Sequence, residues 1–509
     1  MVSKVYSLGY FGLEVYPVEI EVDTQRGLPS ISVVGLVDAQ VKESKDRVRS
    51  AIKNSGFEFP SQKITINLAP ANIKKEGTQF DLAIALGLIS SSGQAHLKNL
   101  SDYFIIGELS LEGSVREVKG VFPMALKAKE KNKKLLVGIN NALEAFLAAN
   151  LEIYPVKNLC EAVAFLTGQF EIKPFKENLD EIFKKEPSYS VDFSEVKGQI
   201  FAKRALEVAA SGMHNVLLIG PPGVGKTMLA KRLPTILPDM EMEEILEVTK
   251  IYSIAGLLDR DEPLVKNRPF CAPHHTASSI ALVGGGANVR PGEITLAHRG
   301  VLFLDELPEF SRDCLEALRQ PLEDGIIIIA RATKHIKFPT RFLFIGAMNP
   351  CPCGYFGSKQ KSCHCTSYQI QKYRNRISGP LLDRIDIHIE LAEVKTDDIL
   401  DKEEAESSFD IKRRVEKAHK IQRERFKNEK IFFNSQMNNK HLKKYCILDS
   451  EASSLLKEAI KHFGFSMRAY DKILKVSRTI ADLAEKDLID AASVSEAIQY
   501  RSLDKNLWV

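Results

Sequence analysis

The sequence predicts an α/β protein built on a parallel sheet with helices on both faces, preceded by an α+β region and followed by helices. Three apolar segments carry the sheet prediction: Val216–Ile219, Val301–Leu304 and Phe342–Gly346. Strands that are apolar throughout are buried on both faces, as in a parallel sheet covered by helices. The flanking regions differ, since residues 1–168 alternate strand and helix patterns and residues 441–509 show helical spacing alone.

Changes in composition and periodicity divide the chain into five predicted segments. The first, residues 1–168, has strand patterns at Ile64–Leu68 and Phe104–Gly107 and helix patterns at Val41–Ser55, Asp81–Ser90 and Val121–Lys131. The others are a charged, proline-containing linker (169–190), the parallel-sheet core (191–394), a charged helical connector (395–440) and a helical C-terminal region (441–509). We interpret the connector, with helical spacing at Ile411, Val415, Ala418 and Ile421, as a solvated helix.

The composition is that of a folded soluble protein. The 509 residues are 44% hydrophobic and 27% charged, and the net charge of +4 permits an anionic partner without requiring one. No run of about 18 uncharged apolar residues predicts a membrane span. The N-terminus lacks the basic start, apolar core and small-residue cleavage site of a secretory signal. We therefore expect a cytoplasmic protein without membrane contact.

A glycine-rich octapeptide follows the first apolar strand and precedes a segment of helix-forming residues. It fits the pattern GxxxxGK[ST] with Gly220, Pro221, Pro222, Gly223, Val224, Gly225, Lys226 and Thr227. Glycines let backbone N–H groups turn inward around phosphates at the N-terminus of a helix. We expect Lys226 to reach the β- and γ-phosphates and Thr227 to ligate Mg²⁺. The octapeptide thus predicts an ATP–Mg²⁺ site.

Polar residues end the other two apolar strands. Asp305 and Glu306 follow Val301–Leu304; the first suits the Mg²⁺ shell and the second a general base that activates water. Asn349 ends the third strand, and we expect it between the first two elements, where it would orient the attacking water. Two carboxylates after a strand can also be a plain solvated terminus. Beside an intact phosphate loop, the pair favours hydrolysis.

Together with LLDRID and a helical region containing an arginine, these motifs resemble an AAA+ ATPase. The stretches APHHTAS, PGEITLAHRGVLFLDELPEF, LRQPLEDG, AMNPCPCGY and SGPLLDRIDIHIE resemble the magnesium-chelatase-like clade and, within it, the YifB/ComM family over essentially the whole chain. The resemblance implies sensor roles for Asn349 and Arg468 and an arginine finger at Arg384. Such a finger acts on a neighbouring subunit's ATP, and the clade's usual state is a hexameric ring. Each arginine can instead form a structural ion pair.

The same resemblance implies a DNA motor that promotes branch migration of incoming single-stranded DNA, as in natural transformation. Residues 326–338 read as a hairpin just before the sensor strand, and Arg331, Lys334 and Lys337 would give it cations for phosphate-backbone contact. An ordinary exposed hairpin with solubilising charges is the alternative. The competing function is ATP-driven remodelling of a protein partner, as in magnesium-chelatase motor subunits. DNA stimulation of the ATPase separates the two.

A glycine-rich insert, Phe270–Glu293, is expected as a flexible hairpin or loop. His274 and His275 lie within it, and they lack a convincing metal-ligand set of their own. We interpret them as structural or close to the nucleotide.

Residues 1–168 resemble the Lon-protease-like fold, which is related to a ribosomal protein S5 domain. Peptidases of that fold use a serine activated by a lysine. By resemblance, Gln79 stands at the serine position and Phe122 at the lysine position, and neither supports that chemistry. Thr78 and Lys119 lie one and three residues away. We predict a non-proteolytic domain that binds DNA or a partner, or closes one end of the ring.

Four of the eight cysteines form two close pairs: Cys351, Cys353, Cys363 and Cys365. Four thiolates satisfy tetrahedral Zn²⁺ and leave no open position, which indicates a structural ion. The single-residue spacing is tighter than in the usual zinc knuckle. Four reduced thiols that pack a loop are the alternative.

Overall fold

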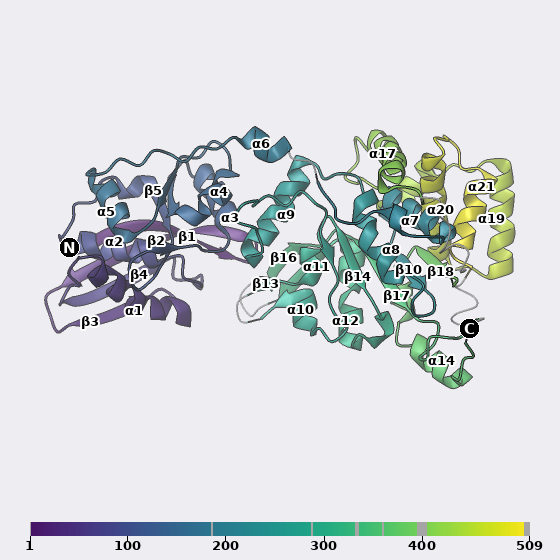
Figure 1. Ribbon diagram of the computed structural model, residues 1–509, viewed down its shortest axis with the longest axis horizontal. Helices are drawn as coiled ribbons and strands as arrows, with labels where there is room; N and C mark the ends of the chain where they lie inside the picture. The colour runs from purple at the N-terminus through teal and green to yellow at the C-terminus, as the bar shows by residue number, and fades with distance from the viewer. Residues whose placement is uncertain are drawn as a thin grey trace. The chain divides into compact units, whose positions relative to one another are not determined.

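The protein is described by a computed structural model that covers residues 2–184, 187–286, 289–330, 335–358, 361–393 and 405–502. The chain forms two compact units (Figure 1). Unit 1 comprises Met1–Glu186, Met242–Val265 and Gly286–Pro291, and unit 2 comprises Pro187–Glu241, Lys266–Gly285 and Gly292–Val509. Two short segments from the middle of the chain therefore belong with the N-terminal residues.

Unit 1 contains two main sheets covered by helices. The first has the order β1-β2-β4-β3, with β1 Val2–Phe11, β2 Glu14–Gln25, β4 Lys63–Ala69 and β3 Ser30–Val34. The second is parallel, with the order β5-β8-β9 and the strands Tyr103–Ile106, Lys134–Gly138 and Ile153–Val156. The main helices are α1 Ala39–Asn54, α2 Asp81–Ser91 and α3 Val121–Glu130, each within two residues of its predicted bounds. The α+β prediction for this region is confirmed.

Helix α9 (Met242–Ala255) lies near the middle of the chain, beyond the start of the unit 2 residues, and yet completes unit 1. The N–H of Gly120, which precedes α3, donates to the Ser253 carbonyl at 3.0 Å. The Ser253 hydroxyl donates to the buried Glu144 carboxylate at 2.6 Å. Phe122, Leu147 and Leu264 form a small core under this junction. The remaining elements of unit 1 are α4 Ala142–Phe146, α5 Leu159–Thr167, α6 Leu179–Lys184, β6 Glu108–Leu109, β7 Val115–Arg116 and β13 Arg290–Pro291.

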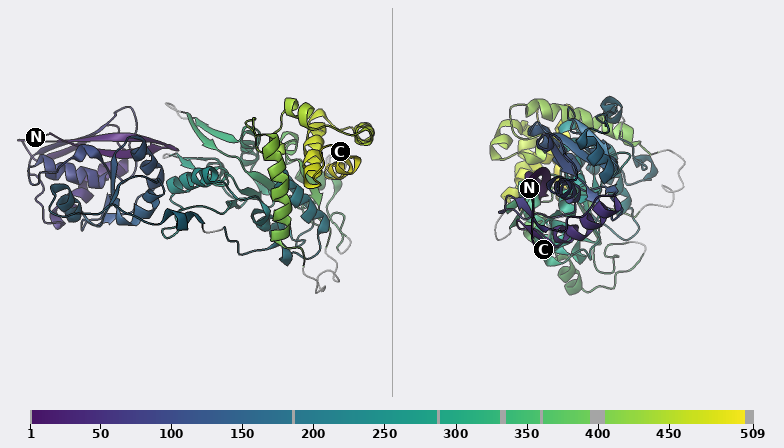
Figure 2. Two further views of the ribbon diagram at one scale, coloured as in Figure 1. Left: turned by 90° about the horizontal axis from the view of Figure 1, so that it is seen from above. Right: turned by 90° about the vertical axis from the view of Figure 1, so that its left-hand side faces the viewer.

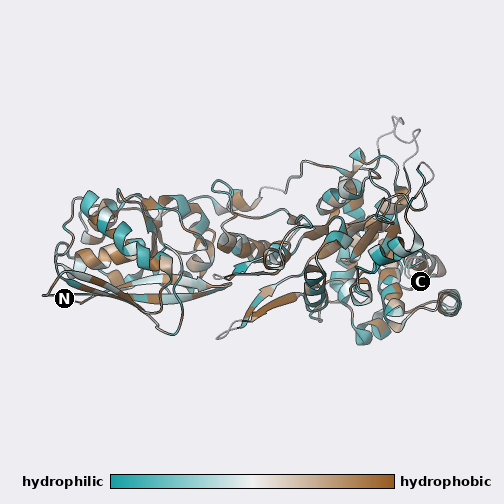
Figure 3. Cartoon of the chain, turned by 90° about the horizontal axis from the view of Figure 1, so that it is seen from below, coloured by the Kyte–Doolittle hydropathy of each residue, from teal (hydrophilic) through white to brown (hydrophobic). Residues whose placement is uncertain are grey.

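Unit 2 is built on a five-stranded sheet with the order β11-β14-β17-β10-β18. The strands are Phe270–Cys271, Val301–Leu304, Leu343–Met348, Val216–Ile219 and Ile387–Glu390, and every neighbouring pair is parallel. β10, β14 and β17 are hydrophobic and buried along their length (Figure 3). The predicted parallel-sheet α/β fold is confirmed. β10, β17 and β14 are adjacent and parallel, so their carboxyl ends, which carry the predicted motifs, lie side by side at one edge of the sheet.

Helices and a hairpin surround this sheet. The helices of the core are α7 Ile200–Gly212, α8 Lys226–Arg232, α10 Ser279–Val283, α11 Glu293–Leu296, α12 Arg312–Ala317, α13 Arg319–Asp324, α14 Ser367–Arg374 and α15 Gly379–Leu382, with β12 at Gly284–Gly285. The hairpin pairs β15 (Ile326–Ala330) with β16 (His335–Pro339) in antiparallel register, so that Ile328 faces Lys337. Figure 2 shows that this hairpin stands out from the body of unit 2.

The C-terminal region consists of α17 Ser408–Arg425, α18 Asn439–Tyr445, α19 Ser450–Phe463, α20 Met467–Leu483 and α21 Ala491–Gln499. The prediction that α17 is solvated was wrong, because Ile411, Val415 and Ala418 are at most 1% exposed, and the first two belong to the main core of unit 2. The apolar spacing marked a buried face, and the abundant charge lies on the opposite side. No helix among the described residues combines the length and apolarity that a membrane crossing requires.

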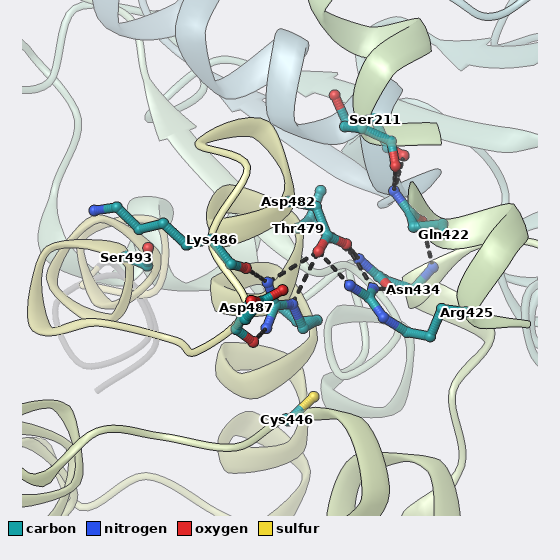
Figure 4. A network of polar contacts seen from close by, with 12 residues as sticks. Ser211, Gln422, Arg425, Asn434, Cys446, Thr479, Asp482, Lys486, Asp487 and Ser493 are labelled. Carbon is teal, nitrogen blue, oxygen red and sulfur yellow. Dashed lines mark hydrogen bonds and ion pairs between the residues drawn. The ribbon is translucent and has the colours of Figure 1, made fainter. Parts of the chain in front are cut away.

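A buried polar network fixes α20 to α17 (Figure 4). Asp482 accepts from Arg425 at 2.6 Å, from the Asn434 amide at 2.8 Å and from Arg478 at 3.0 Å. The Gln422 amide of α17 donates to the Ser211 carbonyl of α7 at 2.8 Å. The C-terminal helices are thereby tied to the sheet-bearing core through satisfied polar groups as well as apolar contacts.

Candidate nucleotide site

The glycine-rich loop leaves the end of β10 and leads directly into α8. Gly223 and Gly225 have φ values of +83° and +93°, which only glycine adopts without strain. A side chain at Gly220 would come within 2.9 Å of the Leu391 carbonyl oxygen. The sequence therefore places glycine where the loop reverses and where it approaches its neighbour, and Lys226 begins the helix.

The Lys226 ammonium is held inside this loop. It donates to the carbonyl oxygens of Gly220 at 2.5 Å and Pro221 at 2.8 Å, and to Asn349 Oδ1 at 2.9 Å. Burial lowers the pKa of Lys226 to about 8, and the nearby charges of Asp305 and Glu306 oppose that shift. A buried cation whose hydrogen-bond partners here are uncharged suits a polyanion that brings the missing negative charge.

Oxygen atoms suited to a hard cation meet beside Lys226. Thr227 Oγ1 donates to Asp305 Oδ2 at 2.6 Å, so the hydroxyl and the carboxylate are close enough to bind one cation together. Oxygen ligands of this kind suit Mg²⁺, which binds few protein groups together with phosphate oxygens. The residues present thus fit both ATP and Mg²⁺. Bound Mg²⁺ would neutralise charge on the phosphates.

Glu306 is held in an unusual backbone conformation next to Asp305. Its φ of +51° lies in the left-handed region, which is rare for a residue with a long side chain. Its N–H donates to Asp305 Oδ1 at 2.9 Å, and its carboxylate pairs with His275 Nδ1 at 3.1 Å. His275 is therefore a neighbour of Glu306, the predicted general base. The sequence suggested that His275 is structural or lies near the nucleotide, and it did not indicate that Glu306 is its partner.

The two predicted arginines contact carboxylates of their own chain. Arg384 pairs with Glu323 and donates to the Pro380 carbonyl at 2.6 Å. Arg468 on α20 pairs with Asp383 at 2.9 Å and is largely exposed. Arg384 and Asp383 are adjacent in the LLDRID segment, so the contact links the C-terminal helices to the segment that carries Arg384.

Comparison with known proteins agrees with the order of these elements. The family described as "Magnesium chelatase, subunit ChlI" matches residues 192–399, "Subunit ChlI of Mg-chelatase" matches 20–141, and the C-terminal ChlI family matches 405–501. YifB of Salmonella typhimurium is 42% identical over 506 residues, which cover 99% of this chain and 97% of the relative. The chain belongs to the YifB/ComM family of magnesium-chelatase-like AAA+ proteins.

Other relatives define the reach of this similarity. Competence protein ComM of Haemophilus influenzae is 42% identical over 502 residues, covering 98% of this chain and 97% of ComM. The magnesium-chelatase 38 kDa subunit of Cereibacter sphaeroides is 25% identical over 174 residues, or 31% of this chain and 52% of the subunit. The likeness to YifB and ComM is thus full-length, whereas the match to this chelatase subunit covers about a third of the chain. Membership of the AAA+ family implies an ATPase.

In this YifB/ComM-family chain, the four clustered cysteines lie between β17 and α14. Their sulfur atoms are all within 4.8 Å of one another. Cys351 lies 3.3 Å from Cys353 and 3.7 Å from Cys363, and Cys353 lies 3.6 Å from Cys363. A disulfide bond would be about 2.05 Å long. The four thiols are therefore unbridged and gathered around one point, an arrangement that can hold a metal ion.

A cavity of about 400 Å³ borders the glycine-rich loop. Its walls come from four parts of unit 2: the loop with the start of α8, the segment before α7, the cysteine-containing region, and Glu393 after β18. The lining residues are Glu195, Val196, Lys197, Gln199, Pro221, Pro222, Gly223, Val224, Gly225, Met228, Tyr355, Lys361 and Glu393. The volume lies within the range of small-ligand pockets.

The predicted protease positions of unit 1 have separate partners. Gln79 is buried and donates to the Glu76 carbonyl at 2.9 Å, and Phe122 is fully buried. Thr78 donates to the Glu108 carboxylate at 2.5 Å, whereas Lys119 donates to the Ala255 carbonyl at 3.5 Å. Each of these side chains thus has a structural contact of its own.

Proposed function

We propose that this AAA+ protein is an ATP-driven DNA motor that works as a ring, preferentially a hexamer, and promotes branch migration of single-stranded or branched DNA. Lys226 and Thr227 bind the phosphates and Mg²⁺, Asp305 completes the Mg²⁺ shell, and Glu306 acts as the base for water oriented by Asn349. The competence protein ComM, 42% identical over 98% of this chain, gives the proposal its biological setting.

The observation that carries the DNA proposal is the position and charge of the β15–β16 hairpin. It leads directly toward β17, whose following residue Asn349 contacts Lys226 at 2.9 Å. His335 and Lys337 are exposed on one side of β16, while Ile336 and Phe338 are buried. Arg331 and Lys334 belong to the same candidate contact and lie outside the described residues. Cations on such a hairpin suit a phosphate backbone without reading base sequence.

The ring is proposed because the family resemblance places an arginine finger at Arg384, whose guanidinium pairs with Glu323 in its own chain. An arginine finger supplied in trans stabilises the charge that develops on the γ-phosphate. In this arrangement the Arg384–Glu323 pair marks the resting position of the finger. Arg468, paired with Asp383, would act as a sensor from the C-terminal helices.

Three-strand branch migration tests the proposal. Wild-type protein with ATP and Mg²⁺ is expected to extend a joint between single-stranded and duplex DNA, and Glu306→Gln is expected to bind ATP and fail. Lys337→Ala should slow migration, and Lys420→Ala, which removes an equally exposed lysine from α17, should not. ATPase activity that DNA leaves unchanged, with no migration, would contradict the DNA motor and favour the remodelling of a protein partner.

We also propose that Cys351, Cys353, Cys363 and Cys365 hold one structural Zn²⁺. Zn–S bonds of about 2.3 Å in a tetrahedron require sulfur–sulfur distances of about 3.8 Å. The Cys351–Cys363 and Cys353–Cys363 distances of 3.7 and 3.6 Å lie close to that edge, and the Cys351–Cys353 distance of 3.3 Å is shorter. In a 4Fe–4S cluster each thiolate binds a different iron, and in a 2Fe–2S cluster the thiolates bind two irons in pairs, so the four sulfur atoms do not surround a single ion. The backbone N–H groups of Phe356 and Cys365 donate to thiol sulfurs at 3.3 and 3.4 Å, as around metal-bound thiolates.

A further inference from the structure

The cysteine loop packs directly against the phosphate-binding loop. Gly354, between the first cysteine pair and Tyr355, has a φ of +85°. A side chain there would approach Pro222 Cδ to 2.8 Å and the Asn349 carboxamide carbon to 3.8 Å. The cysteine loop is therefore in close contact with Pro222, which stands in the middle of the phosphate loop.

The same loop forms one wall of the cavity beside the phosphate loop. Tyr355 and Lys361 line it together with Glu195, Val196, Lys197 and Gln199. The Lys361 ammonium lies 5.1 Å from the centre of the Tyr355 ring, so the two side chains stand together. Lys226, Thr227 and Asp305 are not among the residues that line the cavity. The cavity thus does not include the predicted Mg²⁺ position. It borders the phosphate loop on another side, which suits the nucleoside of a nucleotide whose phosphates are bound by that loop.

Polar contacts at two places hold this wall in addition to the cysteines. Ser358 donates to Glu393 at 2.5 Å and accepts from the Lys361 N–H at 3.2 Å. At the start of the loop, Arg374 donates to the Pro350 carbonyl at 3.1 Å. Tyr355 lies two residues after Cys353, and Lys361 lies two residues before Cys363. A metal ion bound by both cysteine pairs would therefore set the separation of the two pocket residues.

We infer that the zinc-bound loop is the nucleoside wall of the ATP site, with Tyr355 and Lys361 as contacts for the base and ribose. Zinc acts here through the shape of the pocket, and the phosphate and Mg²⁺ ligands are separate from it. The inference rests on the proposed ATP and zinc sites and is independent of DNA. It assigns a binding role to two residues and gives the metal a functional consequence.

The first test compares ATP with inorganic tripolyphosphate, which lacks a nucleoside. Binding of both to full-length protein is measured by calorimetry without DNA. Tyr355→Ala is expected to raise the Kd for ATP about tenfold, in line with the removal of one aromatic–base interaction, and to leave the Kd for tripolyphosphate within about twofold. A structural role for Tyr355 would weaken both ligands together. Unchanged ATP affinity in Tyr355→Ala overturns the inference.

The second test concerns the metal. Purified wild-type protein is expected to contain one zinc per chain by elemental analysis, and Cys363→Ser to lose it and to bind ATP about tenfold more weakly. Cys160→Ser, an exposed cysteine of unit 1, is the control and should keep both zinc and affinity. Iron or no metal in the wild-type protein, or wild-type ATP affinity in zinc-free Cys363→Ser, overturns the inference. If Cys363→Ser does not fold, the ATP affinity of wild-type protein is compared before and after zinc is removed with a chelator, and again after zinc is added back.

Discussion

The buried network around Asp482 makes a quantitative prediction for the C-terminal helices. Asp482 is 1% exposed and faces Arg478, which is also 1% exposed, and Arg425, whose side chain is 13% exposed. The change Asp482→Ala would leave two guanidinium groups without their carboxylate. Removing one partner of a buried ion pair costs about 3–5 kcal/mol, because the remaining charge stays desolvated. Since 1.4 kcal/mol is a factor of ten, opening of α20 should become about 10² to 4 × 10³ times more frequent.

Hydrogen exchange measures this opening directly. Backbone amides in the middle of α20 should exchange about 10² to 4 × 10³ times faster in Asp482→Ala than in the wild type. Lys417→Ala is the matched control, since it breaks an ion pair with Glu485 in which both side chains are 62% exposed. Exposed pairs contribute about 0–1 kcal/mol, so this control should change exchange by less than tenfold. Exchange in Asp482→Ala within threefold of the wild type would refute the reasoning.

The remaining predictions concern the nucleotide site. The pKa of Lys226 is lowered to about 8, and bound phosphates need its positive charge, so ATP affinity should fall as pH rises through 8. The variant Lys226→Arg should bind ATP with an affinity that does not change with pH up to about pH 9.5. An ATP affinity of the wild type that is the same on both sides of pH 8 would contradict this prediction. Mixing Glu306→Gln with Arg384→Ala should restore hydrolysis at about a quarter of the interfaces, since each variant supplies what the other lacks. A mixture no more active than its separate components argues against a shared site. His275→Ala should lower kcat about tenfold at an unchanged nucleotide Kd, because it removes the partner of Glu306. If steady-state kinetics give His275→Ala the kcat of the wild type, His275 has no role in orienting Glu306.

The sequence predicted the sheet and the phosphate loop because both depend on local pattern. Apolar strands and a glycine-rich turn specify their own conformation, and Val216–Ile219 and Val301–Leu304 match the observed strands residue for residue. The meeting of three strand ends follows from the parallel arrangement, in which all carboxyl ends share one edge.

Contacts between residues far apart in the chain could not be predicted from the sequence. The pairing of Arg384 with Glu323 spans 61 positions, and the packing of Gly354 on Pro222 spans more than a hundred. Helix α17 was misjudged because its charges outnumber its apolar residues, although a single stripe at Ile411, Val415 and Ala418 was enough to bury one face. The assignment of α9 to unit 1 likewise depends on tertiary packing against α3.

The salt dependence of DNA-stimulated ATP hydrolysis tests the central claim most directly. Steady-state ATPase rates are measured against single-stranded DNA concentration at a series of salt concentrations. We predict stimulation whose half-saturating DNA concentration rises steeply with salt, and a slope on logarithmic axes that Lys337→Ala lowers by about 0.7 for each phosphate that the side chain no longer neutralises. An ATPase rate that is the same with and without DNA at every salt concentration would contradict the proposed motor.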